Sequence, residues 1–449
     1  MRTQLNGGRP ANATRAAATV RLDHRRGVAP RPRQLPIEQI IAVGGWILLV
    51  LSVQPWQRPS RGPQAVAEGM TTSKGVLIAA IFMVALALAA PGFRARMPLF
   101  YLVYMMYLCV AAASAFQVEA AGTPLLRALR LGLAIWIPLL LWRWLGGRSA
   151  LFVRAHRMAH ALLAFVVVAG VALSPGNAWE GSGSGARLQG AFIPMLPPRV
   201  GEVAAILAGL MIIALVFRQV RRIPASLLVV MGMLVLLLSQ TRTAAAALVA
   251  GLLGAFILAS QSRQGRQGLR VLLLLSLLAV PLLGPIQTWV VRDQSAQQLS
   301  SLTGRSIAWH YVLNEPVSIR TLMLGHGLGN TGVVLRRGEG DIDTMGIDSG
   351  WLSLYWQTGL VGVGLIAVAM IIGYMTAWRA PTPYIRAVAG FLLVYVTVAS
   401  FTETGLSDLS SQTLHLLVAT GAAYADRLLA RGQPPLLTAL ARPHPLPSR

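Results

Sequence analysis

The sequence predicts an all-α protein that crosses a membrane many times. Of its 449 residues, 55% are hydrophobic and only 12% are charged, whereas a soluble domain carries about 25% charged residues. The mean hydropathy is +0.60. Many apolar runs approach the roughly 20 residues that a helix needs to cross a hydrocarbon core. We therefore expect a polytopic membrane protein of about twelve transmembrane helices, with one long periplasmic loop that contains short helices.

The predicted transmembrane helices follow one another with mostly short connections, as expected for antiparallel neighbours. They cover residues 38–54, 75–91, 98–116, 128–145, 158–174, 203–218, 224–239, 244–260, 271–291, 351–377, 387–402 and 410–426. An even number of crossings leaves both termini on the same side of the membrane.

The placement of basic residues predicts which side that is. The formal net charge is +24, which in a soluble protein would indicate a nucleic-acid partner. Most of the basic residues lie instead in the arm at 1–36, in short loops on the same side, and in the tail at 427–449. By the positive-inside rule, this side is cytoplasmic. We expect no nucleic acid, a disordered arm that touches anionic lipid, and a multi-pass protein of a bacterial inner membrane.

Cysteine and histidine usage predicts neither a disulfide nor a metal. Cys109 is the only cysteine, so no intramolecular disulfide can form. No histidine, cysteine or acidic residues have the spacing typical of a metal site, and we expect no cofactor. His156 and His160 are expected on the cytoplasmic surface.

Two segments on the predicted periplasmic side are longer than the other connections, at about 176–202 and 292–350. Loops of such length are usually functional. In the second, SSLTGRSIAWHYVLNEP reads as a short interfacial helix that Ser301 or Thr303 caps and Pro316 ends. The following LGHGLGNTG lacks the strand–turn–helix context of a dinucleotide site. The helices themselves contain almost no charge, which favours binding or reaction at the periplasmic surface over carriage through the bilayer.

Three arginines on the periplasmic side are candidate phosphate ligands. Arg242 lies in the tight turn of LLLSQTRTAAAALVAG, while Arg187 and Arg305 lie in the two long loops. A guanidinium at headgroup depth binds phosphate bidentately. The alternatives are that Arg242 reaches to lipid headgroups and that Arg187 and Arg305 are solvated surface charges. Three converging arginines would stabilise a departing pyrophosphate without a metal.

One acid, Asp348, begins the predicted helix at 351–377 in DSGWLSLYWQTG. As an N-cap it would accept hydrogen bonds from free backbone amides. As a general base it would take a proton from a sugar hydroxyl. His310 and His326 are alternative bases because imidazole titrates near neutrality.

Several stretches, taken in order, carry a family resemblance. RLQGAF, SQTRTAAAALVAGLLGAF, TGRSIAWHYVLNEP, LGHGLGNTG and DSGWLSLYWQTGLVGVGLIA resemble the bacterial O-antigen ligase and polymerase superfamily (WaaL and Wzy-type enzymes). The resemblance covers about 187–378, which it identifies as a catalytic region with the periplasmic loop 292–350. Transmembrane helices flank it at 37–186 and 379–426.

The resemblance implies an inverting, metal-independent glycosyltransferase that acts on undecaprenyl-pyrophosphate-linked oligosaccharide at the periplasmic face. Arg187, Arg242 and Arg305 would contact the pyrophosphate, His326 and Trp351 would complete the substrate-binding set, and Asp348 would be catalytic with Arg242 and Arg305. A chain-length regulator and export machinery are the implied protein partners.

The residues at 348 and 349 differ from those that the ligases of this family usually carry, and the difference favours the polymerases. Ligases usually carry His-Asn where this chain has Asp348 and Ser349, which favours a Wzy-type exopolysaccharide polymerase. The alternatives are an O-antigen ligase with a lipid A-core acceptor, a lipid-linked oligosaccharide flippase, and a structural partner of a polysaccharide assembly machine.

Overall fold

The computed structural model describes residues 37–54, 72–89, 97–118, 121–141, 149–181, 186–278, 281, 305–336 and 342–431. The predicted arm at 1–36, most of the predicted tail and the segment 282–304 of the long loop lie outside the described residues, as do Ser301 and Thr303.

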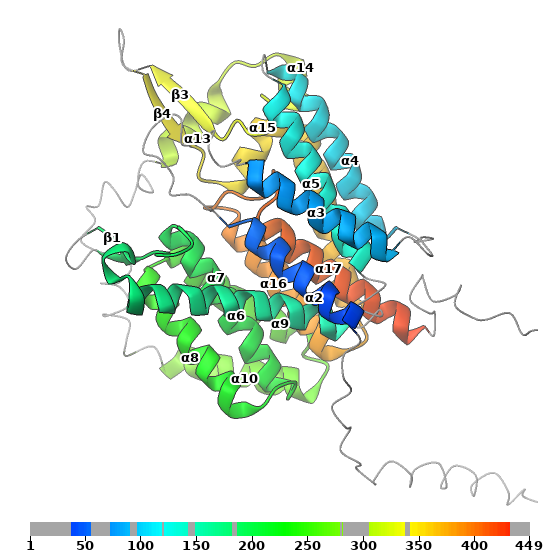
Figure 1. Ribbon diagram of the computed structural model, residues 1–449, viewed down its shortest axis with the longest axis vertical. Coiled ribbons are helices and arrows are strands. Elements are labelled where there is room, and N and C mark those ends of the chain that lie inside the picture. The colour runs from blue at the N-terminus through cyan, green and yellow to red at the C-terminus, as the bar shows by residue number, and fades with distance from the viewer. Residues whose placement is uncertain are drawn as a thin grey trace, which may run out of the picture.

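The described chain is almost entirely helical (Figure 1). The helices are α2 (Ile37–Ser52), α3 (Thr72–Ala89), α4 (Leu99–Ser114), α5 (Gly122–Leu141), α6 (Ser149–Leu173), α7 (Pro197–Val216), α8 (Arg222–Ser239), α9 (Arg242–Leu258), α10 (Arg263–Leu278), α13 (Arg305–Asn314), α14 (Ile319–Leu324), α15 (Gly350–Trp378), α16 (Pro383–Ala399) and α17 (Ser411–Ala430). A helix lies at each predicted transmembrane position. The helix at the predicted 271–291 begins earlier, at Arg263, and the described part of it ends at Leu278.

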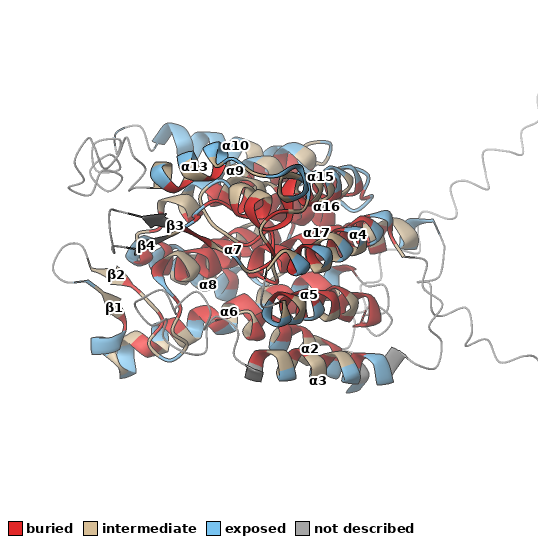
Figure 2. Cartoon of the chain, turned by 90° about the horizontal axis from the view of Figure 1, so that it is seen from above, coloured by how far each residue is buried: buried red, intermediate tan, exposed pale blue. Residues whose placement is uncertain are grey.

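Two small antiparallel hairpins interrupt the helices. β1 (Trp179–Glu180) pairs with β2 (Arg187–Leu188), and β3 (Gly332–Arg336) pairs with β4 (Ile342–Gly346). The hairpins and α13 lie at the same end of the bundle, at the left in Figures 1 and 2. We call this the hairpin end. The sequence analysis did not predict either hairpin, because β1 and β2 have only two residues each and GVVLR in β3 does not alternate between apolar and polar residues.

The protein is a multi-pass membrane protein. Among the described residues, six helices are long and apolar enough to cross a membrane, namely α4 with its extension to Gln117, α5, α6, α7, α8 and α15. Four shorter apolar helices accompany them. On α8, Leu227, Val230, Leu234 and Leu237 are more than half exposed and recur at helical spacing. Such an unbroken apolar stripe is stable in lipid and would be unfavourable in water.

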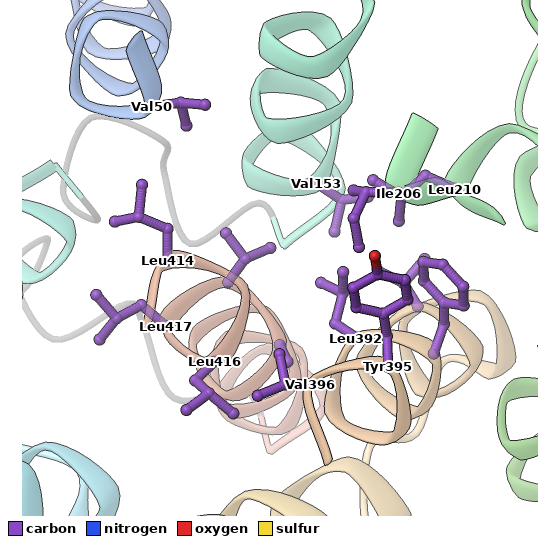
Figure 3. Close-up of a cluster of buried hydrophobic side chains, with 14 of the residues drawn as sticks. Val50, Val153, Ile206, Leu210, Leu392, Tyr395, Val396, Leu414, Leu416 and Leu417 are labelled. Carbon is purple, nitrogen blue, oxygen red and sulfur yellow. The ribbon is translucent and has the colours of Figure 1, made fainter. Parts of the chain in front are cut away.

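The core lies where α2, α6, α7, α16 and α17 meet. Figure 3 shows Val153, Ile206 and Leu210 facing Leu392 and Tyr395 of α16. Val50 of α2 lies on the side of Leu414 of α17, where Leu416, Leu417 and Val396 are also drawn. Glycines allow α9 to approach α16 closely, since a Cβ at Gly251 would meet the Phe391 ring. Small residues of this kind let transmembrane helices pack through their backbones.

Helix α15 is broken at Gly359, which has φ 65° and ψ −169°. The predicted helix over 351–377 is therefore present with a break inside it, which the sequence analysis did not predict. The glycine-rich loop at 325–329 packs against the break, where the amide of His326 donates to the Trp356 carbonyl at 2.7 Å and that of Gly327 donates to the Gln357 carbonyl at 3.1 Å. A side chain at Gly359 would collide with the backbone of Met323. The loop thus satisfies carbonyls that the break leaves without a helical partner.

Candidate functional site

The turn between α8 and α9 positions Arg242 at the hairpin end. Gln240 ends α8 in a left-handed conformation with φ 52°, and its side-chain amide donates to the Ala186 carbonyl at 3.2 Å. Arg187 Nε in turn donates to the Ser239 carbonyl at 3.4 Å. These two bonds hold β2 against the turn, and the guanidiniums of Arg187 and Arg242 are close enough to repel each other electrostatically.

The third predicted arginine pairs with the predicted acid. Arg305 is the first residue of α13, which ends before Pro316 as predicted. Its Nε lies 3.3 Å from Oδ2 of Asp348. The Asp348 side chain is 55% exposed and does not cap α15, because Ser349 is the N-cap and its Oγ accepts from the Leu352 amide at 3.4 Å. The N-cap interpretation of Asp348 is therefore wrong.

Helix α13 rests on the protein through one face. Ala308 and Val312 are buried in a small cluster with Val333, Ile347 and Trp356. Ile307 and Leu313, on the other face, are exposed. The helix therefore carries Arg305 on a surface that β3 and the start of α15 hold in place.

Glu403, in the connection between α16 and α17, is a second carboxyl group at the site. The amide of Gly350 donates to the Ser400 carbonyl at 2.7 Å, which holds this connection against the start of α15. Thr402 bonds to Thr243 at 2.8 Å, next to Arg242. Burial raises the pKa of Glu403 to about 7; Arg199 and Arg305 oppose this shift, while Glu202 and Asp348 reinforce it. A carboxyl with this pKa is suited to proton transfer at neutral pH.

Electrostatic interactions join the predicted arginines into one group. Burial lowers the pKa of Arg187, Glu180 and Glu403 oppose that shift, and Arg305 adds to it. Arg187 therefore lies within the field of both Arg242 and Arg305. Guanidiniums that interact electrostatically with one another and with carboxyl groups could together bind a multivalent anion and accept a proton beside it.

Arg127 and Arg130 of α5 and Glu202 of α7 are buried, and Arg127 and Glu202 lie just outside the predicted ranges 128–145 and 203–218. Arg199 donates to Glu202 at 2.7 Å and to Ser411 at 2.6 Å. Asp408 lies 3.2 Å from Arg130 and 3.7 Å from Arg127. These residues stand near predicted helix ends, where a charge does not interrupt the apolar run that defines a span. Their burial is possible because each charge is paired, Glu202 with Arg199 of the same helix and the two arginines of α5 with Asp408 in the connection before α17.

The predicted residues His326 and Trp351 have different surroundings. The His326 ring stacks on Trp356 with centroids 3.6 Å apart, and its Nδ1 lies 3.3 Å from the Trp356 carbonyl oxygen. These contacts place His326 at the break in α15 and do not include the Arg305–Asp348 pair. Trp351 lies in the first turn of α15 and packs against the main core. His310, the other alternative base, is exposed on α13 and bonds to Asn314.

His156 and His160 are completely or almost completely buried, at 0% and 1% exposure. The prediction that they are surface residues is wrong. Both belong to α6, which begins at Ser149, earlier than the predicted 158, so they lie inside the helix and not in a cytoplasmic loop.

Sequence reasoning assigned no role to Glu403, which stands in FTETGLSD between two apolar helices. The signal that could have indicated it is an acid in a short connection on the same side as the candidate arginines. No protein-family model matches the chain, and no curated protein matches it in sequence.

Proposed function

We propose that the protein is a membrane glycosyltransferase that extends undecaprenyl-pyrophosphate-linked oligosaccharide at the periplasmic face of a bacterial inner membrane, as a Wzy-type polysaccharide polymerase. The observation that carries this proposal is the Arg305–Asp348 pair. It is supported by the bond that ties Arg187 to the turn before Arg242 and by the Thr243–Thr402 bond, which ties the connection that contains Glu403 to the start of α9. Guanidiniums recognise phosphate through paired hydrogen bonds. Carboxylates in the same site can accept the proton that glycosyl transfer releases.

In the proposed reaction, the three arginines bind the pyrophosphate of the growing, lipid-linked chain. A hydroxyl at the non-reducing end of a new lipid-linked repeat attacks the anomeric carbon. The bond from that carbon to the pyrophosphate oxygen breaks, the configuration inverts, and the electron pair leaves with the pyrophosphate. The arginines stabilise the charge that develops there.

Glu403 takes the hydroxyl proton in this scheme. Its pKa of about 7 makes it a better base at neutral pH than an exposed carboxylate. Asp348, which is paired with Arg305 at 3.3 Å, orients that arginine toward the leaving group. Holding two membrane-confined substrates at one site supplies a further part of the rate.

Two alternatives share parts of this evidence. A ligase would use the same arginines with a lipid A-core acceptor. The polymerase is favoured over the ligase because this chain has Asp348 and Ser349 where ligases usually have His-Asn. The break in α15 favours a flippase, because discontinuous helices are common in transporters. The freed carbonyls at the break, however, bond to the loop at 325–329 and do not line an open path.

Deletion of the protein followed by gel and mass-spectrometric analysis of lipid-linked glycans separates these functions. Accumulated single repeats on the periplasmic side indicate a polymerase. Long lipid-linked chains that fail to reach lipid A indicate a ligase, and repeats held on the cytoplasmic side indicate a flippase.

Complementation with variants then tests the site. Arg242→Ala should lower the elongation rate about 100- to 1,000-fold, and Arg242→Lys should lower it less, because lysine keeps the charge but loses bidentate geometry. Arg320→Ala is the matched control, since Arg320 is exposed on α14. Normal elongation by both Arg242→Ala and Asp348→Asn would exclude the proposed site.

A further inference from the structure

We propose that His156, His160 and His415 form a binding site for a divalent transition-metal ion inside the helix bundle, separate from the proposed glycosyl transfer. His156 and His160 are four residues apart on α6, which puts both rings on one face of the helix. His415 reaches the same point from the second turn of α17. Two helices that are far apart in the sequence therefore contribute three imidazoles to one site.

The ring nitrogens are close enough to share one ion. His156 Nε2 lies 3.0 Å from His415 Nδ1. Each of the three histidines offers one ligand atom, and these atoms all lie within 4.8 Å of one another. In a tetrahedral site with metal–nitrogen bonds of 2.0–2.1 Å, the ligand nitrogens are about 3.3 Å apart. The His156–His415 pair has to open by only a few tenths of an ångström to admit an ion.

Neighbouring groups hold the rings of His415 and His160 by the hydrogen bonds that orient metal-binding histidines in other proteins. A ligating histidine normally donates its other N–H to a carboxylate or a carbonyl. His415 Nε2 donates to Oε1 of Glu202 at 3.2 Å, and Oε2 of Glu202 accepts from Arg199 at 2.7 Å. His160 Nδ1 donates to the His156 carbonyl at 2.9 Å. These bonds leave Nδ1 of His415 and Nε2 of His160 without a proton, so that each has a lone pair that could bind an ion.

The surroundings select the class of ion. His156, His160 and His415 are at most 1% exposed. The ring centroid of Tyr395, which is drawn in Figure 3, lies 6.2 Å from that of His415. A purely imidazole first shell suits zinc, copper, iron or nickel and disfavours calcium or magnesium. Glu202, which is 8% exposed, accepts a hydrogen bond from His415 and so places a negative charge next to one of the proposed ligands.

The Trp46→Phe variant distinguishes a metal site from a cluster of histidines that only form hydrogen bonds with one another. The indole Nε1 of Trp46 lies 3.4 Å from His156 Nδ1, and an indole N–H can only donate. Without an ion, His156 therefore carries its proton on Nε2 and donates it to His415. When Nε2 binds an ion, the proton moves to Nδ1 and faces the indole N–H. Replacing Trp46 by phenylalanine removes this conflict and should tighten metal binding.

The experiment uses the full chain, purified in detergent with a tag that contains no histidine. After chelator treatment, the protein is incubated with Zn²⁺, desalted and analysed for metal by mass spectrometry, and affinities are measured by competition. We expect one zinc per chain. His156→Ala, His160→Ala and His415→Ala should lose it, and the matched control His310→Ala should keep it. Glu202→Gln should bind about 10- to 100-fold more weakly, and Trp46→Phe should bind more tightly.

X-ray absorption spectroscopy at the zinc edge identifies the ligands in the wild-type protein, so this result does not depend on whether the variants fold. We expect three nitrogen ligands at about 2.0–2.1 Å and no sulfur. The proposal is overturned if the wild-type chain retains no zinc, if sulfur ligands are found, or if folded His156→Ala and His415→Ala proteins bind zinc as well as His310→Ala does.

Discussion

At the scale of single residues, Glu403 and Asp348 show how two carboxyl groups in one site acquire different properties. Asp348 is exposed and paired with Arg305 at 3.3 Å. Glu403 is partly buried, and burial raises its pKa to about 7 despite the positive charges of Arg199 and Arg305. Catalytic sites commonly place two carboxyl groups in different environments, so that each has its own role. The difference is why we assign the proton to Glu403 and the orientation of Arg305 to Asp348.

The pH dependence of kcat/KM for lipid-linked repeats tests this assignment. Because a general base must be ionised, kcat/KM should fall about tenfold per pH unit as the pH is lowered through 7. Glu403→Gln should reduce kcat/KM at least 100-fold and abolish this decline. Asp348→Asn should move the decline to lower pH, because the negative charge of Asp348 raises the pKa of Glu403.

Glu315→Gln, the same chemical change at the end of α13, serves as the control and should leave the profile unchanged. A Glu403→Gln protein with the wild-type decline would show that another group takes the proton.

At the scale of elements, α15 depends on a segment outside itself. Its backbone leaves helical geometry at Gly359, and the loop at 325–329 bonds to the carbonyls of Trp356 and Gln357. Gly325 has φ 76°, and a side chain there would collide with Gln357. Both glycines are needed because loop and helix meet backbone to backbone. The break also limits the first part of α15 to residues 350–358, which begin two residues after Asp348.

Substitution of single glycines in α15 tests this dependence. Gly359→Ala adds a Cβ that collides with Met323 at a positive φ, so we expect a lower melting temperature and faster proteolysis near 319–329. Gly364→Ala is the matched control, because a Cβ there meets nothing within 4 Å and alanine favours the helix. Equal stability of the two variants would contradict a strained contact at Gly359.

At the scale of the whole molecule, apolar length predicted the positions of the helices well. In hydrocarbon a helix satisfies its own backbone hydrogen bonds, so a local run of apolar residues is enough to specify it. Contacts between distant segments were not predictable in this way. The histidine cluster joins α6 to α17. Glu403, in the connection after α16, interacts with Arg199 of α7 and Arg305 of α13. The break in α15 depends on hydrogen bonds from the loop at 325–329. None of these leaves a periodic signal in the sequence.

The proposed orientation of the bundle can be measured with single cysteines in a Cys109→Ala background. Arg320 lies in α14, on the predicted periplasmic side, and Gln264 lies at the start of α10; both are exposed. A membrane-impermeant thiol reagent should label Arg320→Cys in intact cells and label Gln264→Cys only after the membrane is opened. Labelling of Gln264→Cys in intact cells would reverse the predicted topology.

The break in α15 also constrains how the chain enters the bilayer. A carbonyl without a partner is costly in hydrocarbon, so residues 350–358 can settle at their final depth only when the loop at 325–329 is already beside them. That loop is synthesised first, and in the proposed topology it has to be exported before α15 is inserted. In that topology, insertion of residues 350–358 is tied to secretion of the segment that precedes them, and a stalled translocation would leave the Asp348 side of the proposed site unassembled.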